Sequence, residues 1–185
     1  AAGVDANYDG VAWGSEFTSN LATPDVWTNL IKYSSDYSNA AWSRDQLSYG
    51  GSVIAPDGST NTTALLTISS WSSYARIAQY SVVVTASTEY TVSWWAKRGT
   101  ATAAQYRIYD FSNGANITAD TSYYSETSSE WVRISKTFTT PSGCVSIGIY
   151  PYTRTSATNG ETFYIWGAQL RAGSTAGPYT PTTAD

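Results

Sequence analysis

The chain has 185 residues, of which 42% are hydrophobic, 15% aromatic and only 13% charged, and its formal net charge is −4. Ten Lys and Arg residues spread along such a chain cannot form the phosphate-neutralising stripe of a nucleic-acid-binding protein, so we expect no nucleic-acid partner. The sequence has no His and one cysteine, Cys144, which excludes His-based catalytic triads, imidazole metal sites and an intramolecular disulfide.

Residues 1–28 differ from the rest of the chain in the pattern of their hydrophobic residues. Their hydrophobic residues are scattered among small and acidic ones, with neither a helical nor a sustained two-residue period. We interpret this segment as an arm for anchoring or oligomerisation, with packing on its own domain as the alternative, because chain ends are ordered only when they are tied down. The predicted partner-binding residues of the arm are Tyr8, Trp13, Phe17 and Trp27.

From Asn29 onward, short runs typical of strands alternate with turn formers such as Pro56-Asp57-Gly58 and Asn159-Gly160. Thr, Tyr and Trp are frequent, and these residues fit a pleated, half-buried surface. The spacing predicts an all-β sandwich or barrel over residues 29–185, with a short helical turn at 37–41. The predicted strands are 29–33, 42–47, 52–55, 63–69, 75–84, 89–98, 104–111, 131–139, 145–152 and 161–171.

The last predicted strand is apolar or small in both alternation phases, as in a strand that is covered on both faces. Phe163 and Ile165 are expected on one side, and Tyr164, Trp166 and Leu170 on the other. The tail that follows is rich in residues with restricted or permissive backbones, which predicts an extended segment that follows the surface. These residues are Gly173, Gly177, Pro178 and Pro181.

Five phrases of the sequence follow one another in a distinctive order. They are NLIKYSSDYSNAAWSR (29–44), VIAPDGSTNTTALL (53–66), EYTVSWWAKRG (89–99), SSEWVRISKTFTTPSG (128–143) and NGETFYIWGAQLRAGSTAGPYTPT (159–182). This order resembles the carbohydrate-binding-module-like jelly-roll domains of bacteriophage virion proteins and of bacterial secreted polysaccharide-degrading proteins. The resemblance implies a jelly-roll β-sandwich of two antiparallel sheets with an extended N-terminal arm. The matching residues look structural, and we expect Trp166 and its neighbours to hold the two sheets together.

Three predicted strands carry aromatic and basic residues in one alternation phase and apolar residues in the other. They are the strands at 89–98, 104–111 and 145–152. If these strands share a sheet, the first phase gathers on its outer face. Flat rings stack on the C–H faces of sugars and fork-shaped cations bind hydroxyl or carboxylate groups, so we predict a glycan-binding face whose basic residues favour an acidic polysaccharide. The alternative is that a loop, the arm or a neighbouring subunit covers these aromatic residues. The predicted face consists of Trp95, Lys97, Arg107, Tyr109, Tyr150 and Tyr152.

Four more aromatic residues lie in Ser-rich connections, where such side chains either rim a binding cleft or anchor a loop. These secondary candidates are Trp71, Tyr74, Tyr123 and Tyr124.

The acidic residues show no paired motif of the kind that glycoside hydrolysis needs, so we predict that the chain is not an enzyme. No cofactor is expected apart from a structural Ca²⁺, for which sandwiches of this kind provide precedent but the sequence no calcium-loop spacing. Its metal ligands are therefore unknown. Cys144 is expected to be a core residue, with a reactive thiol as the alternative. No apolar run approaches the ~20 residues that span a bilayer, which argues against membrane insertion.

These observations predict a non-catalytic surface protein of a bacteriophage virion: a capsid decoration, fibre or tail-tip component. Its glycan-binding-type jelly roll would stabilise the particle or adhere to the host surface. The expected partners are other virion proteins, further copies of the chain in an assembly such as a trimer, and cell-surface or environmental polysaccharide. The alternative is a carbohydrate-binding module excised from a secreted, extracellular bacterial enzyme that degrades polysaccharide.

Overall fold

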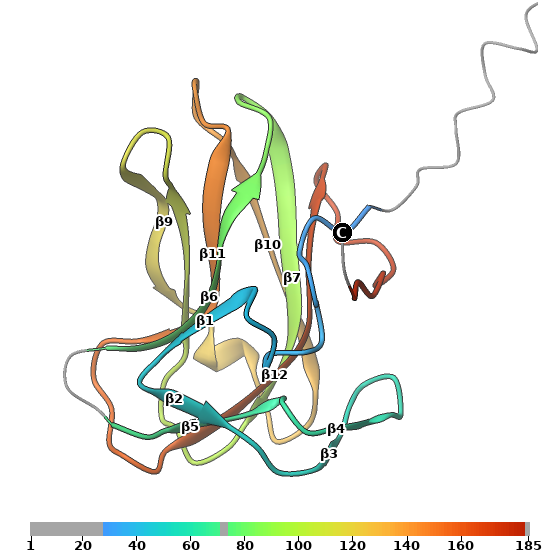
Figure 1. Cartoon of the computed structure of the whole chain (residues 1–185), viewed down its shortest axis with the longest axis vertical. Coiled ribbons are helices and arrows are strands. Elements are labelled where there is room, and N and C mark those ends of the chain that lie inside the picture. The colour runs from blue at the N-terminus through green and yellow to red at the C-terminus, as the bar shows by residue number, and fades with distance from the viewer. Residues whose placement is uncertain (1–27, 71–73, 184–185) are drawn as a thin grey trace, which may run out of the picture.

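The computed structural model describes residues 28–70 and 74–183, which form an all-β jelly-roll sandwich of two antiparallel five-stranded sheets (Figure 1). Sheet A has the strand order β1 (Trp42–Asp45), β6 (Ala75–Val83), β11 (Ser146–Arg154), β8 (Gln105–Asp110) and β9 (Ala115–Ser122). Sheet B has the order β10 (Val132–Thr139), β7 (Glu89–Arg98), β12 (Thr162–Ala172), β5 (Leu65–Ile68) and β2 (Leu47–Tyr49). A small ladder joins β3 (Val53–Ile54) to β4 (Thr60–Asn61), and a one-turn 3-10 helix spans Tyr124–Glu126.

Most predicted strands are confirmed, and β7 has the predicted bounds. The predicted strand 42–47 is divided into β1 and β2, because Gln46 has a φ of 57° that breaks the extended backbone. Residues 29–33 do not form the predicted strand, and residues 37–41 form turns without the predicted helical turn. The sequence pattern also missed β4 and the edge strand β9.

The core lies between the two sheets and is built largely from β-branched and aromatic side chains. Trp94 of β7 is fully buried there and meets the ring of Tyr123 at a centroid distance of 5.2 Å. Phe163 of β12 stacks on Tyr152 of β11 at 5.1 Å, so the ring pair joins one sheet to the other. Large aromatic side chains contribute most to such a core, because each one removes a large apolar area from water.

A β-bulge in β12 changes which of its side chains face the core. The register of β12 against β7 shifts between Trp166 and Gln169, where Gly167 has a φ of 63°. After the bulge, Leu170 is buried in the same core as Phe163, so the predicted placement of Leu170 on the side of Trp166 is wrong. Simple alternation cannot anticipate this, because one extra residue reverses the phase of every side chain that follows.

Trp166 belongs to a second, smaller apolar cluster, on the outer face of sheet B, that also contains Ala55, Ala64, Trp95 and Tyr179. The expectation that Trp166 holds the two sheets together is therefore wrong. It instead packs the C-terminal tail onto sheet B, and its ring lies 4.9 Å from that of Tyr179.

The tail after β12 follows the surface of sheet B, as the sequence predicts. Gln169 holds it with three hydrogen bonds: its amide nitrogen donates to the carbonyls of Ala176 (2.6 Å) and Pro178 (3.1 Å), and its amide oxygen accepts from the backbone nitrogen of Thr180 (2.8 Å). The Asn29 amide donates to the carbonyls of Ala168 and Thr180, which ties the start of the sandwich to its end. The tail thus covers part of the outer face of sheet B. Its hydrogen bonds through Gln169 are also made to sheet B and not to sheet A.

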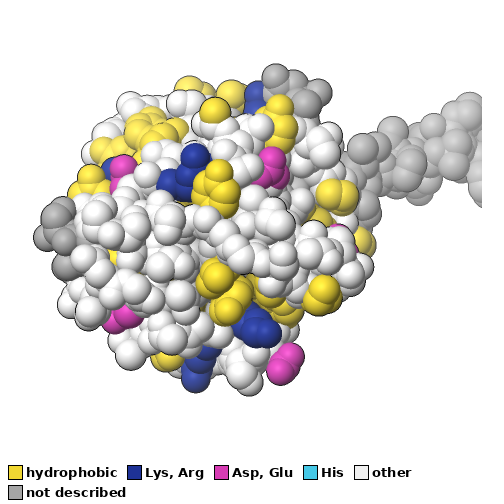
Figure 2. Space-filling model, turned by 60° about the horizontal axis from the view of Figure 1, so that its bottom comes forward, with side chains coloured by type: hydrophobic (Ala, Val, Ile, Leu, Met, Phe, Trp, Pro, Cys, Tyr) yellow, Lys and Arg dark blue, Asp and Glu magenta, His cyan; other side chains and the backbone are white. Residues whose placement is uncertain are grey.

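The surface visible in Figure 2 is mainly uncharged and polar. Hydrophobic side chains lie on it singly or in small groups, and Lys, Arg, Asp and Glu are few and separate. This face shows no basic stripe of the kind that would follow a phosphate backbone.

Candidate functional site

The outer face of sheet A carries a group of aromatic rings that we call the aromatic face. Tyr80 comes from β6, Tyr109 from β8 and Tyr150 from β11, while Phe111 directly follows β8 and Tyr74 directly precedes β6. Three of these rings are open to solvent: Tyr74 is 37% exposed, Tyr80 36% and Phe111 44%. Exposed rings grouped on one sheet face are a feature of binding surfaces, whereas single ones need no explanation.

The rings of the aromatic face contact one another edge to face. Tyr80 lies 5.8 Å from Phe111 at an interplanar angle of 89°, and 5.7 Å from Tyr150 at 61°. Tyr109 lies 5.1 Å from Phe111. Such edge-to-face contacts stabilise ring pairs. Because the planes of Tyr80 and Phe111 are almost perpendicular, the two rings form the walls of a corner.

Two local backbone features give this corner its shape. β6 has a bulge opposite the β11 residues between Ile147 and Ile149, where the register of the two strands shifts. Ser81, in this bulge, has a φ of 55°. Opposite this bulge lies Gly148, and a Cβ atom there would come within 2.9 Å of the Phe111 ring and 3.1 Å of the Tyr150 ring. Glycine therefore allows the two rings to lie low over the strand, which a side chain would prevent.

Tyr150 is only 5% exposed and supports the face from below. The guanidinium groups of Arg76 and Arg107 flank it, with their central carbons 5.7 Å and 5.6 Å from its ring centroid. Burial is the main reason why the pKa of Tyr150 is raised, so its hydroxyl stays protonated at neutral pH. Arg76 also lies 4.4 Å from the ring centroid of Tyr74, which extends the aromatic face to the start of β6.

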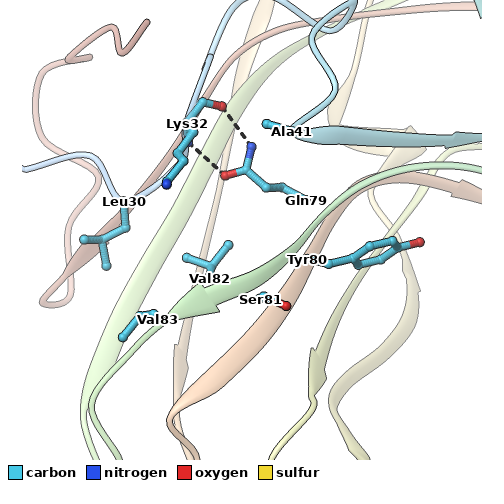
Figure 3. A pocket seen from close by; sticks show the side chains of 8 residues that line it. All are labelled: Leu30, Lys32, Ala41, Gln79, Tyr80, Ser81, Val82 and Val83. Atoms are coloured by element: carbon cyan, nitrogen blue, oxygen red, sulfur yellow. Dashed lines mark hydrogen bonds between the residues drawn. The ribbon is translucent and has the colours of Figure 1, made fainter. Parts of the chain in front are cut away.

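A hollow of about 490 Å³ adjoins the aromatic face at the edge of sheet A (Figure 3). β6 runs on past the last residue that pairs with β1, Gln79, and residues 79–83 line the hollow together with Leu30, Lys32 and Ala41. The Gln79 amide accepts from the backbone nitrogen of Lys32 and donates to its carbonyl, both at 2.8 Å, which holds the entering chain against β6. In Figure 3 the ring of Tyr80 points away from this hollow, so the hollow and the ring corner are neighbouring but separate features.

The six residues of the predicted sugar face do not lie together, because the three strands do not share a sheet. Arg107, Tyr109 and Tyr150 belong to sheet A and contribute to the aromatic face. Trp95 and Lys97 are on β7 in sheet B. Trp95 is partly buried, and it contacts Trp166 and Tyr179 at 5.3 Å each, so the C-terminal tail packs on it in place of the loop, arm or subunit named in the alternative. Lys97 lies 5.8 Å from the ring of Tyr164 on that same sheet.

Tyr152 faces the core and not the outer surface, so its predicted orientation is wrong. The register of β11 shifts at Pro151 against both neighbouring strands, because proline has no N–H to donate to the ladder. Burial raises the pKa of Tyr152 to about 12.

The secondary candidates are divided among different environments. Tyr74 lies beside the aromatic face, but Tyr123 is fully buried and donates a hydrogen bond to the Pro151 carbonyl at 2.8 Å. Tyr124 is half-buried, with the guanidinium of Arg98 4.3 Å from its ring centroid. Outside the described residues lie Trp71 and the arm residues Tyr8, Trp13, Phe17 and Trp27.

Sequence reasoning missed three members of the site, Arg76, Tyr80 and Phe111. The signal was present, because Arg76 and Tyr80 occupy the phase of β6 opposite to the buried Ile77. Phe111 likewise continues the phase of Arg107 and Tyr109. Alternation along β6 and β8 therefore predicts an outward direction for all three side chains.

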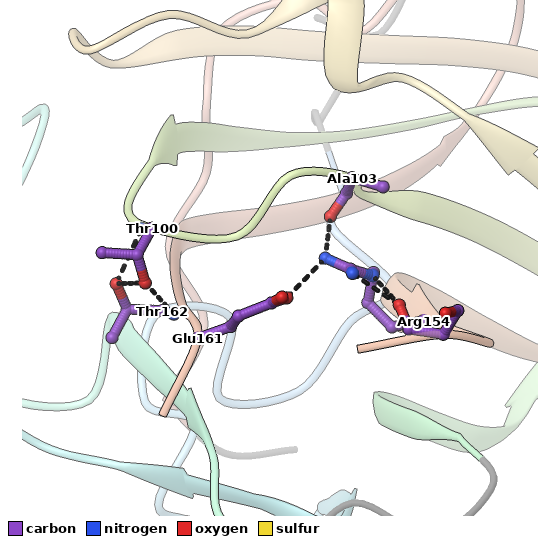
Figure 4. A network of polar contacts seen from close by, with 6 residues as sticks. Thr100, Ala103, Arg154, Glu161 and Thr162 are labelled. Atoms are coloured by element: carbon purple, nitrogen blue, oxygen red, sulfur yellow. Dashed lines mark hydrogen bonds and ion pairs between the residues drawn. The ribbon is translucent and has the colours of Figure 1, made fainter. Parts of the chain in front are cut away.

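A buried ion pair lies at one end of the sandwich, between Arg154 of β11 and Glu161 just before β12, at 3.0 Å (Figure 4). Arg154 also donates to the Ala103 carbonyl at 2.8 Å, and Thr100 and Thr162 are hydrogen-bonded nearby. These contacts hold the 99–103 connection against β11 and the start of β12. Glu161 is thereby paired with a cation.

Within residues 28–70 and 74–183, no three His, Cys, Asp or Glu side chains gather as a metal site would require. Calcium also accepts backbone carbonyl ligands, so the Ca²⁺ site stays a prediction. In the same part of the chain, no helix has the length and apolar character to cross a membrane.

No protein-family model and no curated protein matches the sequence. Several solved structures share its fold. The enzymatically active domain of tailspike protein 4 from bacteriophage CBA120 has a TM-score of 0.57 at 17% identity, over 78% of this chain and 21% of that chain. A family 16 carbohydrate-binding module has a TM-score of 0.52 at 20% identity, over 77% and 99% of the two chains. A family 4 module has a TM-score of 0.52 at 15% identity, over 76% and 94%.

The chain therefore spans about a fifth of the tailspike domain and nearly all of each carbohydrate-binding module. At these identities the likeness establishes the fold. The protein has a carbohydrate-binding-module-like jelly roll, which confirms the resemblance predicted from the sequence.

Proposed function

We propose that this protein is a non-catalytic glycan-binding jelly roll and that the aromatic face is its binding surface. The observation that carries the proposal is the set of exposed rings of Tyr74, Tyr80 and Phe111 beside Arg76 and Arg107 on one sheet face. A sugar ring offers an apolar C–H face to an aromatic ring and hydroxyl groups to a guanidinium. Both kinds of partner are present here within one patch.

The perpendicular rings support a single glycan chain as the ligand and not the flat face of a crystalline polymer. Tyr80 and Phe111 meet at 89°, so one flat surface cannot stack on both. A single chain that turns between consecutive sugar units can place one unit on each ring.

A non-catalytic role is supported by the contacts of the carboxylates at this face. Glycoside hydrolysis generally requires one protonated and one ionised carboxyl group on either side of the scissile bond. Asp45 and Asp120 are instead each in an ion pair with an arginine, Arg76 and Arg107 respectively. Each of these two carboxylates is therefore already engaged by a cation of the protein itself.

The variant Tyr80→Ala tests the proposal against a panel of soluble polysaccharides, with binding measured by affinity gel electrophoresis and calorimetry. We expect the wild-type chain to bind at least one glycan and the variant to bind it about tenfold more weakly or worse, a loss of about 1.4 kcal/mol or more. Unfolding temperatures should stay similar, because Tyr80 is partly exposed.

The matched control is Tyr49→Ala, since Tyr49 is 40% exposed but belongs to β2 of the other sheet. This control should bind as the wild type does. An absence of binding to every glycan, or equal binding by Tyr80→Ala and wild type, would contradict the proposal.

We further propose that the chain is displayed on the surface of a bacteriophage virion as a decoration, fibre or tail-tip component, where it stabilises the particle or adheres to host polysaccharide. The similar fold within a phage tailspike domain supports this setting. A module from a secreted polysaccharide-degrading enzyme is the second candidate, favoured by the near-complete coverage of isolated carbohydrate-binding modules. Mass spectrometry distinguishes the two, because peptides of this chain should be found in purified phage particles in the first case and in the secreted enzyme fraction in the second.

A further inference from the structure

Each arginine of the aromatic face already has an acidic partner within the protein. Arg76 donates from its Nε to the Oδ2 of Asp45 at 2.5 Å. Arg107 binds Asp120 with two parallel hydrogen bonds, from Nε to Oδ1 at 3.0 Å and from its Nη2 to Oδ2. All four side chains are less than one-third exposed, so solvent screens these pairs less than it would on an open surface.

The two pairs lie on opposite sides of Tyr150. Asp45 is on β1, Arg76 on β6, Arg107 on β8 and Asp120 on β9, so the two arginines lie inside the row and an acid stands at each end of it. With two cations and two anions, this row has a formal charge of zero. The row therefore offers hydrogen-bond donors and acceptors without a net charge.

We propose that this face selects neutral, hydroxyl-rich glycans and discriminates against acidic ones, an inference that rests on the proposed function. A sugar hydroxyl can accept from the guanidinium nitrogen of Arg107 that Asp120 does not engage, and it can donate to a carboxylate oxygen. Neutral sugars can thus bind without breaking either ion pair.

An acidic sugar meets a different situation. Its carboxylate must displace Asp45 or Asp120 from an arginine or lie close to one of them, and an anion beside a carboxylate is repelled. The sequence-based expectation of an acidic polysaccharide relied on Lys97 and Arg107 together, yet these residues lie on different sheets. Arg107 itself is neutralised by Asp120.

The test compares neutral polysaccharides (β-glucan, xylan and galactomannan) with acidic ones (polygalacturonate and alginate), at low and at high salt. We expect the wild-type chain to bind a neutral glycan with little dependence on salt and to bind the acidic glycans at least about tenfold more weakly. In Asp120→Asn the guanidinium of Arg107 loses its anionic partner. The ratio of acidic to neutral affinity should then rise about tenfold, with the gain lost at high salt.

The matched control is Glu126→Gln, which removes the same formal charge from the ion pair of Glu126 with Lys136, away from the aromatic face. Its affinity ratio should equal that of the wild type. Asp45→Asn provides a second variant if Asp120→Asn fails to fold, because it frees Arg76 in the same way.

Three results overturn the inference. If the wild type prefers an acidic glycan and loses it at high salt, the selectivity is wrong while the proposed function stands. If folded Asp120→Asn and Asp45→Asn both keep the wild-type affinity ratio, the ion pairs do not set it. If no glycan of either class binds, the proposed function fails, and the inference fails with it.

Discussion

Cys144 lies fully buried beside Asp110, and these surroundings determine the chemistry of its thiol. Burial first, and then the neighbouring carboxylate, raise the pKa of the thiol from an ordinary value of 9.0 to about 11. Both causes disfavour the thiolate, which is the form that reacts. The core role expected from the sequence is therefore confirmed.

A thiol reagent at mildly alkaline pH should consequently label Cys144 much more slowly in the folded protein than in urea. Raising the pKa by about two units lowers the thiolate fraction about a hundredfold at pH values below both, and burial adds a barrier to access. In the folded state the rate should rise as the pH climbs toward 11, whereas in urea it should level off above 9. Stopped-flow labelling with a chromogenic disulfide measures both rates, and equal rates would show that the thiol is accessible in the folded state.

Tyr150 and Tyr152 are two residues apart on β11 but lie on opposite faces of sheet A. Both tyrosines occupy the outward phase of a predicted strand, and the prediction succeeds for Tyr150 but fails for Tyr152, which is buried against Phe163. The difference arises at Pro151, where a bulge reverses the phase. Proline in a strand signals a bulge in the sequence, but it does not tell which of the following side chains turns inward.

The bulge in β12 lies within the apolar cluster on the outer face of sheet B, next to Trp166. Gly167 adopts a φ of 63°, and a Cβ atom there would lie 2.9 Å from the ring of Trp95. Gly167→Ala should therefore lower the free energy of unfolding by about 3 kcal/mol, from the strained backbone and the ring clash together. Urea unfolding followed by tryptophan fluorescence measures this loss.

Gly160→Ala is the control for that prediction. Gly160 also has a positive φ, 88°, but nothing lies within 4 Å of the added atom. Its cost should be about 1 kcal/mol, the backbone contribution alone. Equal losses in the two variants would mean that contact with Trp95 does not constrain the bulge.

Elements with a distinct apolar phase were predictable, and those without one were not. β7 has buried side chains along most of its length and was predicted with its observed bounds. β9 has the sequence ANITADTS, none of whose residues is buried, so no pattern separates it from a loop. An edge strand of this kind forms because β8 pairs with it, and that information is not local.

At the scale of the whole molecule, the sequence predicted the jelly roll but not the assignment of strands to sheets. The predicted face placed β7, β8 and β11 in one sheet, whereas β7 pairs with β10 and β12 in sheet B. Alternation tells which residues share a face of one strand, and strand order depends on pairings between distant segments. For this reason the candidate residues were divided between two surfaces with different roles.

The C-terminal tail makes these two surfaces different, because it packs on Trp95 and Trp166 of sheet B, whereas none of its ring contacts in the described part of the chain involves the aromatic face of sheet A. Truncation after Ala172 would remove the ring of Tyr179 and the carbonyl of Gly177, which accepts a hydrogen bond from Arg133 at 2.5 Å. It would also break the three hydrogen bonds of Gln169.

We expect this truncation to lower the free energy of unfolding by about 4 kcal/mol, from one large buried ring and several hydrogen bonds, and to shift tryptophan emission to longer wavelength. Truncation after Thr182 is the control, because it keeps all of these contacts. Chains of the first kind that remain folded should still bind glycan as the full chain does, since the aromatic face lies on the opposite sheet. Loss of binding in a folded truncated chain would place the ligand on sheet B, where Trp95 and Trp166 would then be the rings it contacts.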